Sequence, residues 1–196
     1  MPDFSYETDA KSRGYNIVCG VDEAGRGPLA GPVCAAAVIL PENCVIEGLN
    51  DSKKLSEKKR EALFPVIKQK AIAYCIAFAG VEEIEKFNIL NATYLAMNRA
   101  VEGLENKPDV AFIDGNRVPA NAPVFCETII KGDLKSYSVA AASVLAKVSR
   151  DRLMLEYDKK YPEYGYAKHK GYPTKAHREV CRKIGPSPIQ RLSFKF

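Results

Sequence analysis

Residues 16–40 read NIVCGVDEAGRGPLAGPVCAAAVIL, and this stretch decides the fold. Its first part, NIVCGVDE, is a β-branched apolar run typical of a buried strand. AGRGPLAGP is rich in the glycine and proline of turns, and VCAAAVIL predicts a second apolar strand. Two strands joined by so short a glycine-rich link predict an antiparallel hairpin.

Three more apolar runs predict strands further along the chain. They are AIAYCIAFAG (71–80), DVAFIDG (109–115) and APVFCETII (122–130). With the helical segments between and after them, the order of elements is β-β-α-β-α-β-β-α. This order predicts an α/β fold in which helices pack against a mixed sheet.

The helical segments are predicted from their periodicity and caps. Ser56 is expected to cap a helix that runs to about Lys70 and contains Pro65, a residue that can kink it. The other helical patterns are one or two helices within 81–105, a long helix over 138–161 that is apolar on one face and basic on the other, and a short helix near 175–183.

The composition bounds the class of protein. A chain of 196 residues with 46% hydrophobic content suits one domain. Its net charge of +5 favours a nucleic-acid partner, although a lysine-rich solvated surface would give the same charge. Six cysteines without a CxxC pair, together with only two histidines, argue against a zinc site.

The N-terminal residues 1–15, MPDFSYETDAKSRGY, form a polar leader that we expect to be partly disordered. This leader does not have the apolar core of a signal peptide. No apolar stretch approaches the roughly 20 residues needed to cross a bilayer. We therefore expect a cytoplasmic protein with reduced cysteines and no membrane attachment.

Four acidic residues stand where predicted strands end. Asp22 and Glu23 end the first strand, Asp114 ends the fourth, and Asp133 follows the fifth. A single Asp in such a place is most often a turn residue or a helix cap. Several converging carboxylates, however, need a compensating positive charge, and Mg²⁺ or Mn²⁺ prefers such oxygen ligands. Two such ions about 4 Å apart can promote hydrolysis of a phosphodiester.

Strand geometry limits how these acids can meet. Neighbouring residues on a regular strand point to opposite faces of the sheet. Asp22 and Glu23 can therefore reach one metal pair only if the strand bends there. The glycines at 25 and 27 make such a bend feasible.

The segment Gly25-Arg26-Gly27 directly follows the acid pair. Two glycines allow a backbone to approach a ligand closely with its N–H groups pointing outward, and Arg26 could contact a phosphate. The alternative is an ordinary tight turn. The position of this segment beside the acids favours ligand binding.

Basic and aromatic residues elsewhere suggest contacts with nucleic acid. Lys53, Lys147 and the segment HKGYPT, which contains His169 and Tyr172, carry this pattern. Lysines bind phosphates without reading sequence, and tyrosine can stack on a base or sugar. The alternative is that the lysines face solvent and that His169 is structural.

Seven segments together resemble those of ribonuclease HII, in the family's order and spacing over residues 18–174. They are GVDEAGRGPLAGPV, LNDSKKLSEKKR, FNILNATYLAMNRAV, FIDGN, IIKGD, AAASVLAKVSRDR and YGYAKHKGYPT. The resemblance implies an RNase H-like fold with a mixed five-stranded sheet flanked by helices and a C-terminal helical extension. We accordingly expect a leader over 1–15, a catalytic domain over 16–160, and an extension over 161–196 that packs on the same domain.

The resemblance also implies which residues form the site. The catalytic carboxylates of the family match Asp22, Glu23, Asp114 and Asp133, and the first three of these match its metal ligands. The substrate-binding residues that it implies are Gly25, Arg26, Gly27, Lys53, Lys147 and Tyr172. In the family, the glycine-arginine-glycine segment and the tyrosine sense the 2′-hydroxyl, the group that distinguishes RNA from DNA at a given sugar.

The activity implied by the resemblance is that of a metal-dependent endoribonuclease. Such an enzyme hydrolyses the RNA strand of RNA–DNA hybrids and nicks 5′ of single ribonucleotides embedded in duplex DNA, leaving 5′-phosphate and 3′-hydroxyl ends. Two divalent ions, Mn²⁺ or Mg²⁺, would serve the reaction. The implied roles are ribonucleotide excision and primer removal during DNA replication, and the expected state is a monomer.

Three other interpretations of the sequence have less support. Ribonuclease HIII, a sister family, carries an extra N-terminal substrate-binding domain for which fifteen polar residues leave no room. A binding module without catalysis would be expected to have lost some of the four acids. A small-molecule α/β enzyme would be expected to show a GxGxxG or P-loop pattern, and neither occurs.

The C-terminal tail, IQRLSFKF, has two interpretations. Its spacing of polar and apolar residues loosely resembles peptides that bind a sliding clamp. The interpretation that we favour is a terminal segment that packs its aromatic residues on the domain. The residues concerned are Gln190, Leu192, Phe194 and Phe196.

Overall fold

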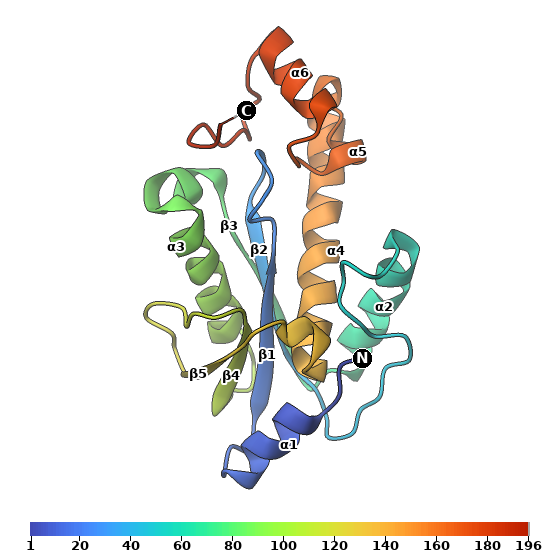
Figure 1. Ribbon diagram of the computed structural model, residues 1–196, viewed down its shortest axis with the longest axis vertical. Coiled ribbons are helices and arrows are strands. Elements are labelled where there is room, and N and C mark those ends of the chain that lie inside the picture. Colours follow the sequence, from blue (N-terminus) through green and yellow to red (C-terminus); the bar gives the residue numbers. More distant parts are fainter. Residues whose placement is uncertain (196) are drawn as a thin grey trace.

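A mixed five-stranded sheet, in the order β3-β2-β1-β4-β5, forms the centre of the computed structural model, which describes residues 1–195 (Figure 1). β1 pairs antiparallel with β2 and parallel with β4, and β5 extends the sheet parallel to β4. The predicted hairpin and the predicted mixed sheet are therefore confirmed. The strands are β1 Val18–Ala24, β2 Val33–Ile39, β3 Ala73–Ala79, β4 Val110–Asp114 and β5 Phe125–Ile129.

The predicted helices are present, with additions at both ends of the chain. Ser56 caps its helix by accepting a hydrogen bond from the Lys59 N–H at 3.3 Å, and that helix continues through Pro65. The helix predicted as one or two is two segments joined at Asn88, whose φ is 66°. The helices are α1 Ser5–Ser12, α2 Glu57–Lys70, α3 Val81–Glu102, α4 Tyr137–Lys160, α5 Tyr166–His169 and α6 Lys175–Ile184, with 3₁₀ turns η1 Gly132–Leu134 and η2 Pro162–Tyr164.

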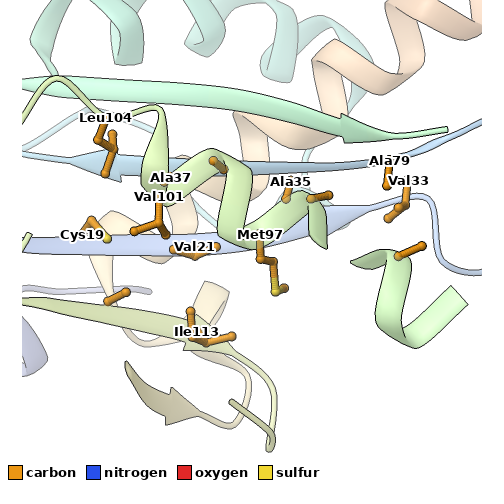
Figure 2. Packing of buried hydrophobic residues seen from close by; sticks show 14 of the residues in the cluster. Cys19, Val21, Val33, Ala35, Ala37, Ala79, Met97, Val101, Leu104 and Ile113 are labelled. Atoms are coloured by element: carbon orange, nitrogen blue, oxygen red, sulfur yellow. The ribbon is translucent and has the colours of Figure 1, made fainter. Parts of the chain in front are cut away.

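Helices cover both faces of the sheet, α3 on one side and α4 with α2 on the other (Figure 1). Alternate strand residues such as Cys19, Val21 and Ala35 turn toward α3, where they meet Met97 and Val101 (Figure 2). The residues between them form a second apolar cluster with α2 and α4. The central strands β1, β2 and β4 are therefore buried on both faces, as their apolar sequences predict, whereas the edge strand β5 is largely exposed.

The first half of α4 is buried on every side, from Tyr137 to Ala146. The prediction of one apolar and one basic face is wrong for this half, because the helix lies between the sheet and α2. Its small side chains allow a close approach to β1. A Cβ atom at Gly20 would overlap the backbone of Ser138 and Val139, so the glycine is required by the contact between strand and helix.

Both ends of the chain pack against this centre. The expectation of a partly disordered leader is wrong for residues 5–12, which form α1. This helix is held in place because the Glu7 carboxylate accepts hydrogen bonds from Ser136 and Ser138 at the start of α4. At the other end, apolar residues of η2, α5, α6 and the tail pack against Ala30 and Met154. Within the described residues, no helix is both long and apolar enough to span a membrane.

Candidate active site

Three carboxylates converge at one edge of the sheet. Asp22 lies in β1, Asp114 ends β4, and Asp133 lies in the turn η1 that follows β5. Because β1, β4 and β5 run parallel, their carboxyl ends meet at the same edge. One oxygen atom from each carboxylate lies within 4.8 Å of the others. The sequence placed these acids at strand ends, and the parallel topology brings them together.

Burial and mutual repulsion make this cluster hard to ionise. Burial raises the pKa of Asp22 well above its ordinary value, and the neighbouring charges of Glu23 and Asp114 raise it further. Burial and the charge of Asp114 raise the pKa of Asp133 to about 6. A bound cation would relieve this repulsion. The donor set, carboxylate oxygen without sulfur or imidazole, fits Mg²⁺ or Mn²⁺.

Glu23 stands apart from the three clustered acids. The β1 ladder stays regular through Ala24, so Glu23 faces the α3 side while Asp22 faces the α4 side. The bend considered from the sequence is not present before Ala24. The Glu23 carboxylate lies 3.3 Å from Nη1 of Arg26. Burial raises the pKa of Glu23, and Arg26 offsets part of that rise.

A cavity of about 330 Å³ connects Glu23 with the surface on the α3 side. Asp114 and Arg26 also line this cavity, together with Tyr94 of α3 and Arg117. Glu23 therefore shares this cavity with the Asp114 carboxylate and with the guanidinium groups of Arg26 and Arg117.

The loop that follows β2 contributes residues that the sequence analysis did not assign. Asp51 is buried beside the acids and accepts a hydrogen bond from the Lys53 N–H at 2.8 Å. The Ser52 hydroxyl lies 2.8 Å from the Ser143 hydroxyl of α4, and Ser143 faces Asp22. The sequence analysis considered the motif NDSKKL only for its lysines. The adjacent polar residues Asp51 and Ser52 were the feature of the sequence that could have indicated a contribution to the site.

Lys53 lies beside the acid cluster. Burial alone would lower the pKa of this ammonium group, but the charges of four nearby carboxylates together outweigh burial and raise it; they belong to Asp22, Asp133, Asp51 and Asp114. Lys53 thus places a positive charge beside the cluster. Its predicted role in binding phosphate stays a prediction.

Two of the other predicted substrate-binding residues, Gly27 and Lys147, lie beside Tyr172, whereas Gly25 is buried beneath the loop. A Cβ atom at Gly27 would lie 3.9 Å from the Tyr172 ring. Lys147 Nζ lies 5.4 Å from the centroid of the same ring and is held by Asp151 at 2.8 Å. Arg26 and Gly27 are both exposed on the loop between β1 and β2. Segments far apart in the sequence therefore form one surface next to the acids.

A mixed sheet of this topology, with three acids converging at the carboxyl ends of its parallel strands, defines a metal-dependent nuclease of the ribonuclease H type. The model of the family described as "Ribonuclease HII" matches residues 19–196. The chain belongs to the ribonuclease HII family. It is therefore a metal-dependent endonuclease that acts on RNA–DNA hybrids.

Individual relatives agree with this assignment. Ribonuclease HII of Endomicrobium trichonymphae is 55% identical over 191 residues, which cover 97% of this chain and 91% of that protein. The ribonuclease H2 structure from Pyrococcus horikoshii superposes with a TM-score of 0.75 at 28% identity, covering 91% of this chain and 94% of the other. The PCNA:RNase HII complex from Archaeoglobus fulgidus contains a chain with a TM-score of 0.72 at 26% identity, with coverages of 92% and 96%.

Proposed function

We propose that this protein nicks duplex DNA on the 5′ side of a single embedded ribonucleotide, in addition to cutting the RNA strand of RNA–DNA hybrids. The observation that carries the proposal is the joint placement of three clustered acids and the surface around Gly27 and Tyr172. The acids can serve hydrolysis of the phosphodiester. The neighbouring surface can recognise the sugar next to it.

Of the expected metal ligands, Asp22 and Asp114 belong to the acid cluster, and Glu23 is proposed to reach the site from the other face of β1. We propose Asp133 as a further ligand, because its carboxylate belongs to the same cluster. We propose two ions, Mn²⁺ or Mg²⁺. Bound divalent ions supply Lewis acidity, which makes water a stronger nucleophile and stabilises charge on the departing 3′ oxygen. The protein's own part is to hold these four carboxylates in place, with β1, β4 and η1 as rigid supports. The resulting ends would be a 5′-phosphate and a 3′-hydroxyl.

Recognition of the ribose is proposed for Gly25, Arg26, Gly27 and Tyr172. The exposed backbone of Arg26 and Gly27 offers N–H donors, and a 2′-hydroxyl both accepts and donates hydrogen bonds. The Tyr172 ring offers a flat face against the sugar or base.

Lys53 and Lys147 are proposed to hold the phosphate backbone on either side of this surface. Lys53 would lie on the side of the acids, and Lys147 would lie on the side of Tyr172.

The proposed partners are RNA–DNA hybrids and DNA duplexes that contain ribonucleotides, bound by a cytoplasmic monomer. A sliding clamp is a second candidate, because the Archaeoglobus protein forms a complex with PCNA. In this chain, Gln190 is buried and Phe194 packs on the apolar cluster under α3, while Leu192 is 65% exposed. These contacts favour packing of the tail over its release to a clamp. Phe196 lies outside the described residues.

Mapping the products of hybrid cleavage tests the reaction. A uniform RNA–DNA hybrid is digested with Mn²⁺, and the fragments are offered to polynucleotide kinase with and without prior phosphatase treatment. Labelling that requires the phosphatase supports 5′-phosphate ends. Direct labelling would mean 5′-hydroxyl ends and would contradict the proposed chemistry.

A further inference from the structure

Two arginines lie fully buried beneath the loop between β1 and β2. Arg150 belongs to α4 and Arg191 to the C-terminal tail, and both are 0% exposed. Within residues 1–195, neither arginine forms an ion pair with a carboxylate. An unpaired buried charge is costly, and burial lowers the pKa of Arg191 to about 9.

Arg191 donates its side-chain hydrogen bonds to the carbonyl groups of the loop between β1 and β2. Its guanidinium donates to the carbonyl oxygens of Gly25 at 2.6 Å, Pro28 at 2.8 Å, Gly31 at 2.8 Å and Arg26 at 3.2 Å. Four carbonyls of one loop thus converge on one planar fork. A lysine ammonium has fewer donors and lacks this planar shape.

Arg150 holds the second half of the same loop. It donates to the carbonyls of Ala30 and Pro32, each at 3.0 Å, and to the carbonyl of Lys170 at 3.0 Å. The last of these bonds joins the loop to the segment that carries Tyr172. Gly25 itself has a φ of +104°, and a Cβ atom there would overlap the Arg150 side chain.

The direction of these carbonyls fixes the direction of the N–H groups. In a trans peptide, the C=O and the following N–H point in opposite directions. Because the Gly25 and Arg26 carbonyls point inward at Arg191, the N–H groups of Arg26 and Gly27 point away from it. Among the described residues, none accepts a hydrogen bond from these two N–H groups. They form an outward pair of donors on an exposed loop.

We propose that Arg191 is a positioning residue for ribose recognition, which presents the N–H groups of Arg26 and Gly27 to the substrate by holding the carbonyls behind them. Arg150 supports the adjoining part of the loop. Replacing buried charges with apolar side chains is often neutral or stabilising, so the charge itself does not account for an arginine here. The convergence of four carbonyl groups on the guanidinium accounts for an arginine at this position. The inference rests on the proposed function, because it assumes that this loop senses the 2′-hydroxyl.

The test compares Arg191→Lys with wild type, with Arg99→Lys as the matched control. Arg99 also uses a guanidinium fork, on Glu83 and the Phe78 carbonyl, but lies on α3 away from the loop. Two measurements are made at a temperature where circular dichroism shows all proteins folded. The first is kcat and KM on a DNA duplex with one ribonucleotide. The second is amide hydrogen exchange at Leu29 and Gly31, whose N–H groups are bonded to Gly171 and Ile189.

For Arg191→Lys, we expect kcat on the single ribonucleotide to fall about 10²-fold, the typical effect of a misplacement of about 1 Å. KM should change little, and exchange at Leu29 and Gly31 should accelerate. Arg99→Lys should leave all of these near wild type. Wild-type kcat and wild-type exchange in a folded Arg191→Lys protein would overturn the inference.

Failure of the proposed function gives a different pattern. If wild type does not cleave at the single ribonucleotide, the proposed function is wrong, and the exchange data alone decide whether Arg191 positions the loop. If Arg191→Lys does not fold, Arg150→Lys is taken through the same two measurements. Unchanged exchange and unchanged kcat in that variant would equally overturn the inference.

Discussion

The imidazole rings of His169 and His177 stack with their centroids 4.4 Å apart and their planes 15° from parallel. Together they hold the backbone on both sides of Tyr172. His169 Nδ1 accepts from the Gly171 N–H at 3.2 Å, while a ring nitrogen of His177 meets the Tyr172 carbonyl at 3.0 Å. A carbonyl can only accept, so that nitrogen of His177 carries the proton. The two histidines of the chain therefore fix the segment proposed to sense the ribose.

Acid should weaken this segment through His169. Burial lowers the pKa of His169 and outweighs the hydrogen bond to the Tyr164 carbonyl, which raises it. The charges of His177 and Lys170 lower the pKa further, while that of Asp158 raises it. The native state thus favours the neutral ring, and its stabilising contribution is present above the ordinary histidine pKa of about 6.5 and is lost as the pH falls below it. Urea unfolding at pH 7.5 and 5.5 should show a larger loss of stability for wild type than for His169→Asn. Equal losses in both proteins would contradict this role.

Removing one clustered acid should separate activity from stability. Asp22→Asn is expected to reduce cleavage at least about 10²-fold, a loss typical of removing one preorganised electrostatic group. In chelator at pH 7, the same variant should unfold at higher urea concentration than wild type. The reason is that folding raises the pKa of Asp22, so the native state favours the protonated carboxyl group. This contribution to stability is present in full below about pH 3.8 and is lost as the pH rises, and asparagine removes the ionisation that causes the loss.

Asp109→Asn is the control for Asp22→Asn. Asp109 directly precedes β4 and lies outside the acid cluster. Its carboxylate accepts hydrogen bonds from the backbone N–H groups of Asn16 and Ile17. The Asp109→Asn variant should keep near-normal cleavage while its free energy of unfolding is reduced. Near-normal cleavage by Asp22→Asn would refute the candidate metal site.

Tyr172 should matter most where one ribose must be recognised. We expect Tyr172→Ala to lower kcat/KM on a single embedded ribonucleotide by about tenfold or more, since loss of a base-stacking aromatic costs about 1–3 kcal/mol. The loss on a long RNA tract should be smaller, because a tract offers a ribose in every register. Tyr172→Phe keeps the ring and isolates the hydroxyl. Equal losses on both substrates would argue against recognition by Tyr172.

Gly20 should be intolerant of even one added methyl group. Because a Cβ atom there would overlap the backbone of Ser138 and Val139, β1 and α4 would have to separate. Overpacking of a core costs about 1–3 kcal/mol, and a backbone neighbour has no rotamer to yield. Gly20→Ala should therefore lower the free energy of unfolding by about 3 kcal/mol. Gly80→Ala at the start of α3 is the control, because its backbone is extended with φ −71° and the nearest atom to an added Cβ is Glu83 Oε2 at 4.0 Å.

Much of the fold was predictable because the strands are continuous apolar runs with acids at their ends. Asp22, Asp114 and Asp133 meet as expected, since parallel neighbours bring their carboxyl ends to one edge. The separation of Glu23 also follows from strand alternation.

Other features depend on tertiary contacts that no local pattern encodes. The burial of α4 on all sides was missed, because its position between sheet and α2 is not visible in its own periodicity. The sequence analysis assigned no role to Arg191, because its hydrogen bond to the Gly25 carbonyl joins residues that are 166 positions apart in the sequence. Asp51 and Ser143 join the site only once the loop after β2 has folded against α4.

The most direct measurement is cleavage of an end-labelled DNA duplex that contains one ribonucleotide, with Mn²⁺, with Mg²⁺ and with chelator. The account predicts a single nick on the 5′ side of that ribonucleotide with a divalent ion and none with chelator. Cutting confined to RNA–DNA hybrids, with the single-ribonucleotide duplex left intact under every condition, would contradict it.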